Sequence, residues 1–263
     1  MRDIVNLDQF PLDTPHSDAY AALVARCQAD LADGGMFNLD GFLRPEVAQA
    51  EVARLTPVID TDSFLHARQH NIYFKPQIEG LASDHLALQT FETSNNTICA
   101  DQLDGSPVAD IYHWPAFRTF LADEMEKPAL FPMKDRLAAY NVMRYKEGQA
   151  LNWHFDRSEF TVTLLLQAPD AGGVFEYRTD LRTADDPNFD GVVALLNGED
   201  PDLQQMSVVP GTLNVFRGVN TPHRVTAIKG ATPRVIAVLT YFERPDVEFS
   251  DTEQLGFYGR IAR

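Results

Sequence analysis

The sequence predicts a mainly β fold with flanking helices, and three observations carry that prediction. Strand-like runs separated by turns fill residues 135–245, the segment before them shows helical periodicity, and 44% of the 263 residues are hydrophobic. Seven or eight strands in this order suit a two-sheet jelly roll, that is, a cupin-like double-stranded β-helix. The runs are LAAYNVMRY, ALNWHF, EFTVTLLLQ, GVFEYRT, GTLNVFRG, HRVTAI and RVIAVLTYFE.

Helices are predicted before residue 135. Apolar residues recur at helical spacing over about residues 17–32, and Gly34-Gly35 supplies a stop. The following MFNLDGFL predicts a short strand or turn, which leads into a helix over about 45–55 with a proline in its first turn. A third helix is expected over about 115–126. Within 57–110 only HNIYF indicates a strand.

The chain is predicted to form one domain over residues 1–263, since β-barrel folds with added helices reach this length as single units. We expect a helical and mixed part over 1–134, a double-stranded β-helix core over 135–245 and a C-terminal tail over 246–263. Residues 183–205 are rich in Asp, Asn, Pro and Gly, which indicates an insertion between two strands rather than a linker.

Charge and composition restrict the partners and the location. A formal net charge of −16 opposes binding to phosphate backbones, so we expect no nucleic-acid partner. Cys27 and Cys99 form no metal or redox motif and are predicted to be buried thiols. The N-terminus lacks a signal-peptide pattern and no run of about 18 apolar residues occurs, so a cytoplasmic protein without membrane contact is expected. The oligomeric state stays open, with a homodimer as one alternative.

Two His-x-Asp triplets are candidates for metal binding. His16-Ser17-Asp18 precedes a predicted helix, where Ser17 or Asp18 is better explained as an N-cap. His154-Phe155-Asp156 instead ends a predicted strand. Residues i and i+2 of a strand project to the same face, so His154 and Asp156 can converge on one ion.

A third ligand is expected from a neighbouring strand, and His223 opens such a strand 69 residues after His154. Two imidazoles and one carboxylate leave three adjacent octahedral positions open, which suits a non-haem Fe(II) oxygenase that binds an organic co-substrate and O₂. The alternative for each histidine is an ordinary hydrogen-bonded side chain.

Arg234 follows His223 by 11 residues and begins an apolar strand. A buried guanidinium at such a place is costly unless a carboxylate meets its planar fork. The distal carboxylate of 2-oxoglutarate would satisfy it, whereas a solvated or salt-bridged arginine is the alternative.

The segments NWHFD, GTLNVFRGVNTPHRV and PRVIAVLTYFE together resemble the Fe(II)/2-oxoglutarate-dependent dioxygenase superfamily over roughly residues 135–245. The resemblance implies that His154, Asp156 and His223 bind iron, that Arg234 anchors 2-oxoglutarate, and that O₂ is consumed with release of succinate and CO₂. Loss of any metal ligand should nearly abolish turnover.

The phrases ARQHNIYF and HFDRSEFTVTLLLQ are further similar to a bacterial group of free-amino-acid halogenases and hydroxylases. In that group the halogenases have Gly or Ala where this chain has Asp156, so the resemblance implies a hydroxylase. Acidic pocket residues expected of members that act on lysine are absent from the matching places, where Arg157, Leu137, Leu151 and Val238 stand.

The predicted function is therefore hydroxylation of an unactivated C–H bond of a small molecule, with a free amino acid or a derivative favoured. A nucleic-acid or protein demethylase and a non-catalytic cupin-like sensor of metal or 2-oxoglutarate are the alternatives. Four phenylalanines, Phe155, Phe160, Phe175 and Phe216, are predicted to be core because they alternate along strands. Candidate substrate contacts are Arg157, Arg68, His70, Asn71, Asn141, Thr240 and Tyr258.

Overall fold

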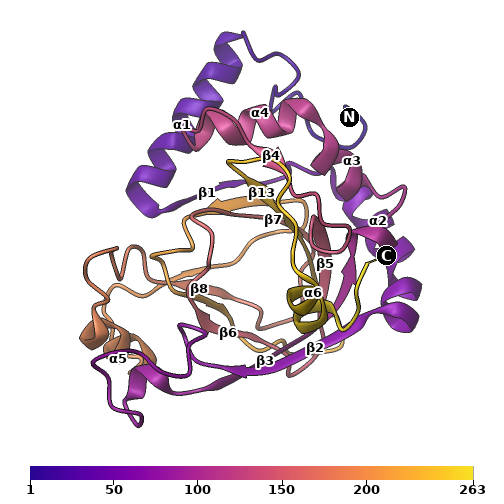
Figure 1. Ribbon diagram of the computed structural model, residues 1–263. Coiled ribbons are helices and arrows are strands. Elements are labelled where there is room, and N and C mark those ends of the chain that lie inside the picture. The colour runs from indigo at the N-terminus through magenta and orange to yellow at the C-terminus, as the bar shows by residue number, and fades with distance from the viewer. Residues whose placement is uncertain (263) are drawn as a thin grey trace.

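The structure, a computed structural model, describes residues 1–262 and has the two-sheet architecture of a jelly roll (Figure 1). All strand pairs are antiparallel. The large sheet contains, in spatial order, β1 (Met36–Leu39), β10 (Leu213–Phe216), β7 (Thr161–Gln167), β12 (Arg234–Leu239), β5 (Tyr140–Tyr145), β3 (Phe91–Cys99) and β2 (Phe64–His70). The small sheet contains β6 (Leu151–His154), β11 (His223–Val225), β8 (Phe175–Tyr177) and β9 (Gln204–Met206), and a separate pair is formed by β13 (Tyr241–Phe242) and β4 (Phe131–Pro132).

Within the part of the chain that the structure describes, six α-helices and two short 3₁₀ turns flank the sheets, as expected for a mainly β fold with flanking helices. They are α1 (Asp18–Gly34), α2 (Pro45–Asp62), α3 (Pro107–His113), α4 (Pro115–Glu124), α5 (Phe189–Asn197), α6 (Asp251–Tyr258), η1 (Leu86–Leu88) and η2 (Ala100–Gln102). Among residues 1–262, no helix combines the length and the apolar character that a membrane span requires.

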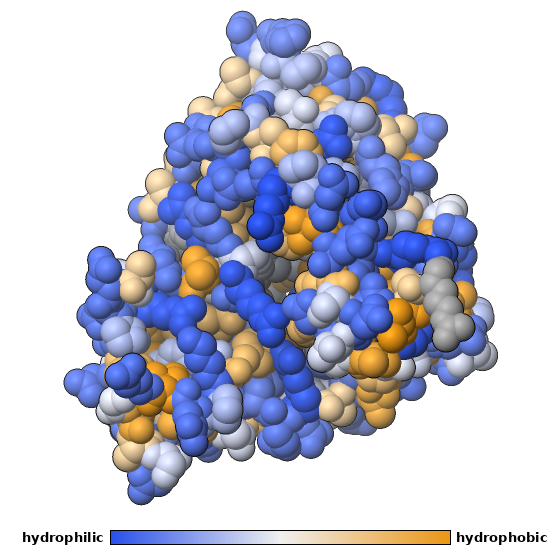
Figure 2. Space-filling model, viewed as in Figure 1, coloured by the Kyte–Doolittle hydropathy of each residue, from blue (hydrophilic) through white to orange (hydrophobic). Residues whose placement is uncertain are grey.

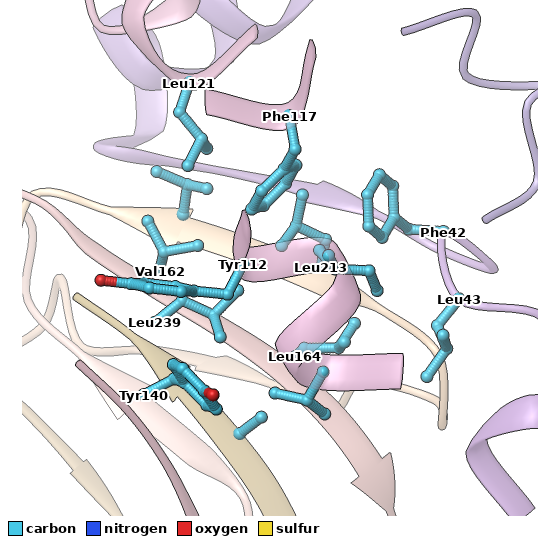
Figure 3. Packing of buried hydrophobic residues seen from close by; sticks show 14 of the residues in the cluster. Phe42, Leu43, Tyr112, Phe117, Leu121, Tyr140, Val162, Leu164, Leu213 and Leu239 are labelled. Atoms are coloured by element: carbon cyan, nitrogen blue, oxygen red, sulfur yellow. The ribbon is translucent and has the colours of Figure 1, made fainter. Parts of the chain in front are cut away.

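The main core lies between the outer face of the large sheet and helices α1 to α4. Alternate residues of β7 and β12 face this core, among them Val162, Leu164 and Leu239, and Phe117 and Leu121 of α4 pack over them (Figure 3). The intervening residues of the same strands, such as Thr163 and Ile236, face the space between the sheets instead. One face of the large sheet thus packs in the main core, and the opposite face lines a cavity that can hold a site.

Three predictions about the N-terminal part are confirmed. Ser17 is the N-cap of α1, since its hydroxyl oxygen accepts a hydrogen bond from the backbone N–H of Tyr20 at 3.1 Å. Gly35 ends this helix in the left-handed conformation at φ 73°. The short strand expected in MFNLDGFL is β1.

Other expectations there are wrong. Helix α2 does not end near Leu55 but continues through Pro57, because buried Leu55 and Ile59 anchor both sides of the proline. HNIYF is not a strand, since β2 ends at His70 and the side-chain oxygen of Asn71 accepts hydrogen bonds from two backbone N–H groups of the following turn.

Strand β3 was missed from the sequence for a physical reason. Its inward-facing residues Thr93, Asn95 and Thr97 are polar and line the cavity, so the strand lacks the apolar alternation that marks a core strand. The predicted insertion at 183–205 does lie between two strands, β8 and β9, and it contains α5. Val192 and Leu195 of α5 pack with Trp153 in a second apolar cluster.

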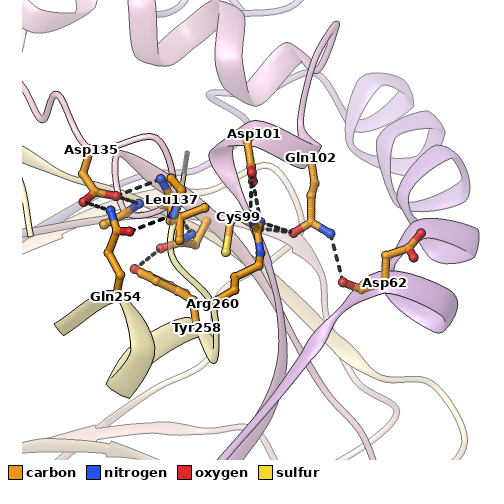
Figure 4. Close-up of polar contacts among 12 residues, drawn as sticks. Asp62, Cys99, Asp101, Gln102, Asp135, Leu137, Gln254, Tyr258 and Arg260 are labelled. Carbon is orange, nitrogen blue, oxygen red and sulfur yellow. Dashed lines mark hydrogen bonds and ion pairs between the residues drawn. The ribbon is translucent and has the colours of Figure 1, made fainter. Parts of the chain in front are cut away.

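The C-terminal tail docks onto the core through polar contacts, two of them buried (Figure 4). These contacts join Gln254 to Asp135, Tyr258 to Asn141, and Arg260 to Asp101. Gly259 follows α6 at φ 67°, and a Cβ there would lie 2.4 Å from the ring of Phe64 on β2. Glycine therefore lets the tail approach the strand closely, which places Phe257 and Tyr258 over one end of the cavity.

Glu124, at the end of α4, is a buried carboxyl group outside that cavity. Its side chain is 1% exposed, and neither oxygen has a hydrogen-bond partner within the described chain. Burial raises its pKa to about 9, with Arg217 as a partly opposing positive charge. The folded protein therefore holds Glu124 as a neutral acid at neutral pH.

Candidate metal centre and cofactor cavity

The three expected metal ligands meet in the small sheet. His154 of β6 and His223 of β11 lie directly opposite one another in the antiparallel register, and Asp156 follows β6 by two residues. The Asp156 Oδ1 atom lies 3.3 Å from His154 Nε2 and 3.7 Å from His223 Nε2. All three ligand atoms lie within 4.8 Å of one another, which one metal ion can bridge.

Backbone carbonyls orient both imidazole rings. His154 Nδ1 lies 2.8 Å from the carbonyl oxygen of Asn152, and His223 Nδ1 lies 3.0 Å from that of Thr221. Because a carbonyl oxygen only accepts, each Nδ1 carries the proton and donates. Each Nε2 therefore presents its lone pair to the centre, as metal-ligating histidines require.

Asp156 is held so that one carboxylate oxygen stays available. The Thr161 hydroxyl donates to Asp156 Oδ2 at 2.5 Å, and the Asp156 backbone N–H donates to the carbonyl oxygen of Gly218 at 3.0 Å. A Cβ on Gly218 would lie 2.0 Å from Oδ2, so only glycine fits beside this carboxylate. Sequence analysis missed both Thr161 and Gly218, because their contact with Asp156 depends on how the strands assemble.

The electrostatics favour the metal-binding protonation states. Burial would raise the pKa of Asp156, but His223, His154 and the Thr161 hydrogen bond outweigh it and hold the pKa well below its usual value. Burial and the neighbouring His154 lower the pKa of His223 to about 4. At neutral pH Asp156 is therefore ionised and His223 is neutral, which are the forms that bind a metal ion.

Arg182 connects the two chain segments that carry the ligands. Its Nε and Nη2 atoms donate to the carbonyl oxygen of Val219 at 3.0 and 2.6 Å. Its guanidinium also lies 3.7 Å from the ring centroid of Phe155, the residue between His154 and Asp156. Nothing in the sequence indicated this role, since Arg182 is distant from both segments along the chain.

A cavity of about 310 Å³ lies beside the metal ligands, between the two sheets. Figure 2 shows the molecule hollowed near the middle of one face, with hydrophilic side chains around the opening. Phe175 and Phe216 line the cavity and flank the His223 ring at centroid distances of 5.5 and 4.7 Å. Phe155, Phe175 and Phe216 are buried as predicted, whereas Phe160 is half-buried beside the main core.

Arg234 lies at the start of β12 and lines the same cavity. Its side chain is buried, and its guanidinium forms no hydrogen bond or ion pair with any other residue in 1–262. Burial lowers its pKa to about 10, which still leaves the group charged at neutral pH. An unpaired buried guanidinium in a cavity fits a carboxylate ligand, because a bidentate ion pair would offset its desolvation.

The candidate substrate residues divide into two groups. Arg68, His70, Arg157 and Tyr258 line the cavity. Both ring nitrogens of His70 are already engaged, with the Asn71 carbonyl oxygen at 3.0 Å and the Thr93 hydroxyl at 2.7 Å. Burial lowers the His70 pKa to about 4, so this ring is a neutral part of the wall.

Asn141, Thr240 and Asn71 do not line the cavity. Asn141 lies on the same face of β5 as the cavity-lining Met143 and Tyr145, but Tyr258 caps it by donating its hydroxyl proton to Asn141 Oδ1 at 3.0 Å. Thr240 lies beyond the end of β12, where its carbonyl oxygen accepts from the Tyr112 hydroxyl at 2.9 Å. The Asn71 side chain is used in the turn after β2.

Comparisons with known proteins agree with this geometry. A family model described as halogenase D matches residues 21–255. The chain belongs to the halogenase D family. No match was found among curated proteins.

Solved structures share the fold at low sequence identity. A 2OG-Fe(II) oxygenase family oxidoreductase from Burkholderia pseudomallei is 17% identical with a TM-score of 0.52, covering 85% of this chain and 92% of its own. A prolyl-4-hydroxylase from Pseudomonas putida is 15% identical with a TM-score of 0.52, covering 84% and 100%. The non-heme alpha ketoglutarate dependent epimerase SnoN is 13% identical with a TM-score of 0.56, covering 84% and 83%, and it has also been solved with Fe³⁺ and alpha ketoglutarate.

These findings confirm the double-stranded β-helix and the expected relation to the Fe(II)/2-oxoglutarate superfamily and its halogenase and hydroxylase group. The expectation of an enzyme of this type is confirmed by family and fold. The two imidazoles, the carboxylate and the unpaired Arg234 fit the expected Fe(II) and 2-oxoglutarate.

Proposed function

We propose that this protein is a non-haem Fe(II)- and 2-oxoglutarate-dependent oxygenase that hydroxylates an unactivated C–H bond of a small molecule, a free amino acid or a derivative. The observation that carries the proposal is a His-Asp-His triad and an unpaired, buried arginine lining one cavity. When bound, Fe(II) and 2-oxoglutarate activate O₂ for oxygen insertion, with release of succinate and CO₂.

The chain's own residues bind, orient and shield. His154, Asp156 and His223 would hold the metal at the cavity that they line. Arg234 would pair with the distal carboxylate of 2-oxoglutarate. The apolar side chains of Phe175, Phe216 and Ile236 exclude water from the space between these groups.

Asp156 decides between hydroxylation and halogenation in this proposal. A halide would need a coordination position on the metal, and the Asp156 carboxylate, which lies between the two histidines, would take one. Thr161 and Gly218 lock this carboxylate in place, so it is not a side chain that swings aside. Membership of the halogenase D family is therefore compatible with hydroxylase chemistry in this member.

A small-molecule substrate is favoured over a macromolecule by size and charge. The cavity of about 310 Å³ matches the lower end of small-ligand sites. The net charge of −16 disfavours a nucleic-acid substrate. Two alternatives stand against this proposal: a demethylase of nucleic acid or protein, and a non-catalytic sensor. Both predict that no small molecule stimulates succinate release in the following test.

The test is succinate release in the presence of Fe(II), O₂ and a panel of amino acids and their derivatives, followed by mass spectrometry of the panel. We expect one class of small molecule to raise succinate above the uncoupled background and to gain one oxygen atom. The His223→Ala variant should lose this activity and its Fe(II) binding. If no small molecule stimulates succinate release, the proposal fails and the sensor or demethylase alternative gains support.

A further inference from the structure

The charged side chains that line the cavity are unbalanced in sign. Arg68, Arg157 and Arg234 are basic, and Asp156 is the one acidic residue among the described residues of the lining. Asp156 faces the two histidines of the metal site and is used there. The chain as a whole has a net charge of −16, so this basic lining is local and opposite in sign to the rest of the molecule.

Arg68 is a second arginine that has no counter-ion among residues 1–262. It lies on β2, and its Nε atom is buried without a hydrogen-bond partner. Its guanidinium lies 4.2 Å from the ring centroid of Phe74 and 5.7 Å from that of Phe257. Burial lowers the pKa of Arg68, and the nearby positive charge of Arg157 lowers it further. The second effect is repulsion between two like charges.

Arg157 lies beside the same phenylalanine. Its guanidinium lies 5.6 Å from the ring centroid of Phe257. Its ion pair with Glu253 is long, at 3.9 Å to Oε1, and the Oε2 atom of Glu253 accepts from the backbone and hydroxyl of Ser250 in a capping box. Arg157 is 71% exposed at the cavity, so it can move to a ligand.

We infer, on the basis of the proposed function, that the substrate is an anion with net negative charge, of which an acidic amino acid is the simplest kind, held by Arg68 and Arg157, which both lie beside Phe257 in the cavity lining. One carboxylate of a neutral amino acid would pair with one of these arginines and leave the other unmatched. A second anionic group matches it, because guanidinium and carboxylate form paired hydrogen bonds.

For a cationic group of the substrate, the cavity lining offers weaker partners than for an anionic group. The cavity lining offers neutral oxygens, including those of Asn95, Asn214 and Thr163, and no free carboxylate among its described residues. An α-ammonium group can bind such oxygens, whereas a lysine-like side chain would place a second positive charge among three arginines. The cavity therefore selects against basic amino acids.

The experiment compares substrates that differ in charge and hardly in shape: glutamate with glutamine, aspartate with asparagine, and lysine as the cation. Each is titrated anaerobically by calorimetry into protein saturated with Fe(II) and 2-oxoglutarate, so that Arg234 is already occupied. We expect at least one acid to bind about 10- to 150-fold more tightly than its amide, as for a charge-assisted contact. Succinate release should follow the same order.

Three single variants assign the effect to residues. Arg68→Gln and Arg157→Gln should each reduce the preference for the acid about tenfold or more, while the exposed surface variant Arg2→Gln changes the net charge equally and should keep the preference. An amide or lysine that binds as tightly as the acid, or an acid preference unchanged in both cavity variants, would overturn the inference.

The failure of this inference can be separated from failure of the proposed function. The visible absorption of the Fe(II) complex with 2-oxoglutarate forms without any substrate. If it appears in the wild-type protein and no acid is preferred, only the anionic substrate class is wrong. If it does not appear, the proposed function fails and the inference fails with it.

Discussion

The buried carboxyl of Glu124 predicts an unusual dependence of stability on pH, and Glu124→Gln tests it. The folded-state pKa of about 9 lies above the ordinary value of 4.5. A raised folded-state pKa stabilises the fold fully below pH 4.5, and that contribution is lost as the pH rises towards 9. Glutamine has nearly the same shape as the neutral acid but does not titrate.

The magnitude follows from the difference in pH units. Between pH 4.5 and pH 7.5, a span of three pH units, Glu124 is ionised in the unfolded chain and neutral in the folded chain. Each of these pH units lowers the free energy of unfolding of the wild-type protein by about 1.36 kcal/mol. Glu124→Gln should therefore raise the free energy of unfolding by about 4 kcal/mol at pH 7.5 and by less than about 1 kcal/mol at pH 5.

The assay is urea unfolding of metal-free protein at pH 5, 6, 7 and 7.5, followed by tryptophan fluorescence. Metal-free protein is used throughout so that metal release at low pH does not contribute. The exposed loop variant Glu79→Gln serves as the control and should change the free energy of unfolding by about 0.5 kcal/mol or less. A difference between Glu124→Gln and wild type that stays constant from pH 5 to 7.5 would refute the reasoning.

Four further predictions concern the site. Arg234→Ala should raise the KM for 2-oxoglutarate about 10- to 150-fold with unchanged Fe(II) affinity, since a charge-assisted hydrogen bond contributes about 1.5–3 kcal/mol, and an unchanged KM would remove Arg234 from this role. Gly218→Ala should lower Fe(II) affinity at least about tenfold, because its Cβ would lie 2.0 Å from Asp156 Oδ2; full affinity in a folded variant contradicts this. Arg182→Gln should lower Fe(II) affinity about 10- to 100-fold, because the Val219 carbonyl oxygen loses both hydrogen bonds from Arg182. Arg178→Gln, just after β8, is the control, and an Fe(II) affinity of Arg182→Gln equal to that of Arg178→Gln would refute the positioning role of Arg182. Asp156→Gly with chloride should yield little chlorinated product, since an open position alone does not place the substrate for halogen transfer, and robust chlorination would show the opposite.

Local periodicity accounts for what could be predicted about the ligands. The i, i+2 spacing predicted that His154 and Asp156 would share one face of a strand end, and their side chains do converge although β6 ends at His154. The strand that begins at His223 and the strand that begins at Arg234 were likewise visible as short apolar runs after turns. Fold class and the four main site residues therefore followed from pattern and spacing.

The local hydrophobic pattern gave wrong predictions for strands that face the cavity rather than the core. Thr93, Asn95 and Thr97 of β3 point towards the ligand space, so the usual apolar alternation is absent and the strand was not recognised. Asn141 and Thr240 were expected to reach the cavity from their strands. The docked tail covers Asn141, and β12 ends before Thr240. The hydrophobic pattern of the strands indicates neither the docking of the tail nor the end of β12.

The sequence by itself determined that a His-x-Asp pair, a distant histidine and an arginine stand at the starts and ends of strands. Only the tertiary structure decided that Thr161, Gly218 and Arg182 hold the metal ligands and that Phe257 brings Arg68 and Arg157 to one opening. The physical reason is the separation along the chain of the residues that must meet. Backbone geometry sets which face of a strand a side chain takes within two residues, whereas contacts between residues tens of positions apart exist only after both sheets and the tail have packed together.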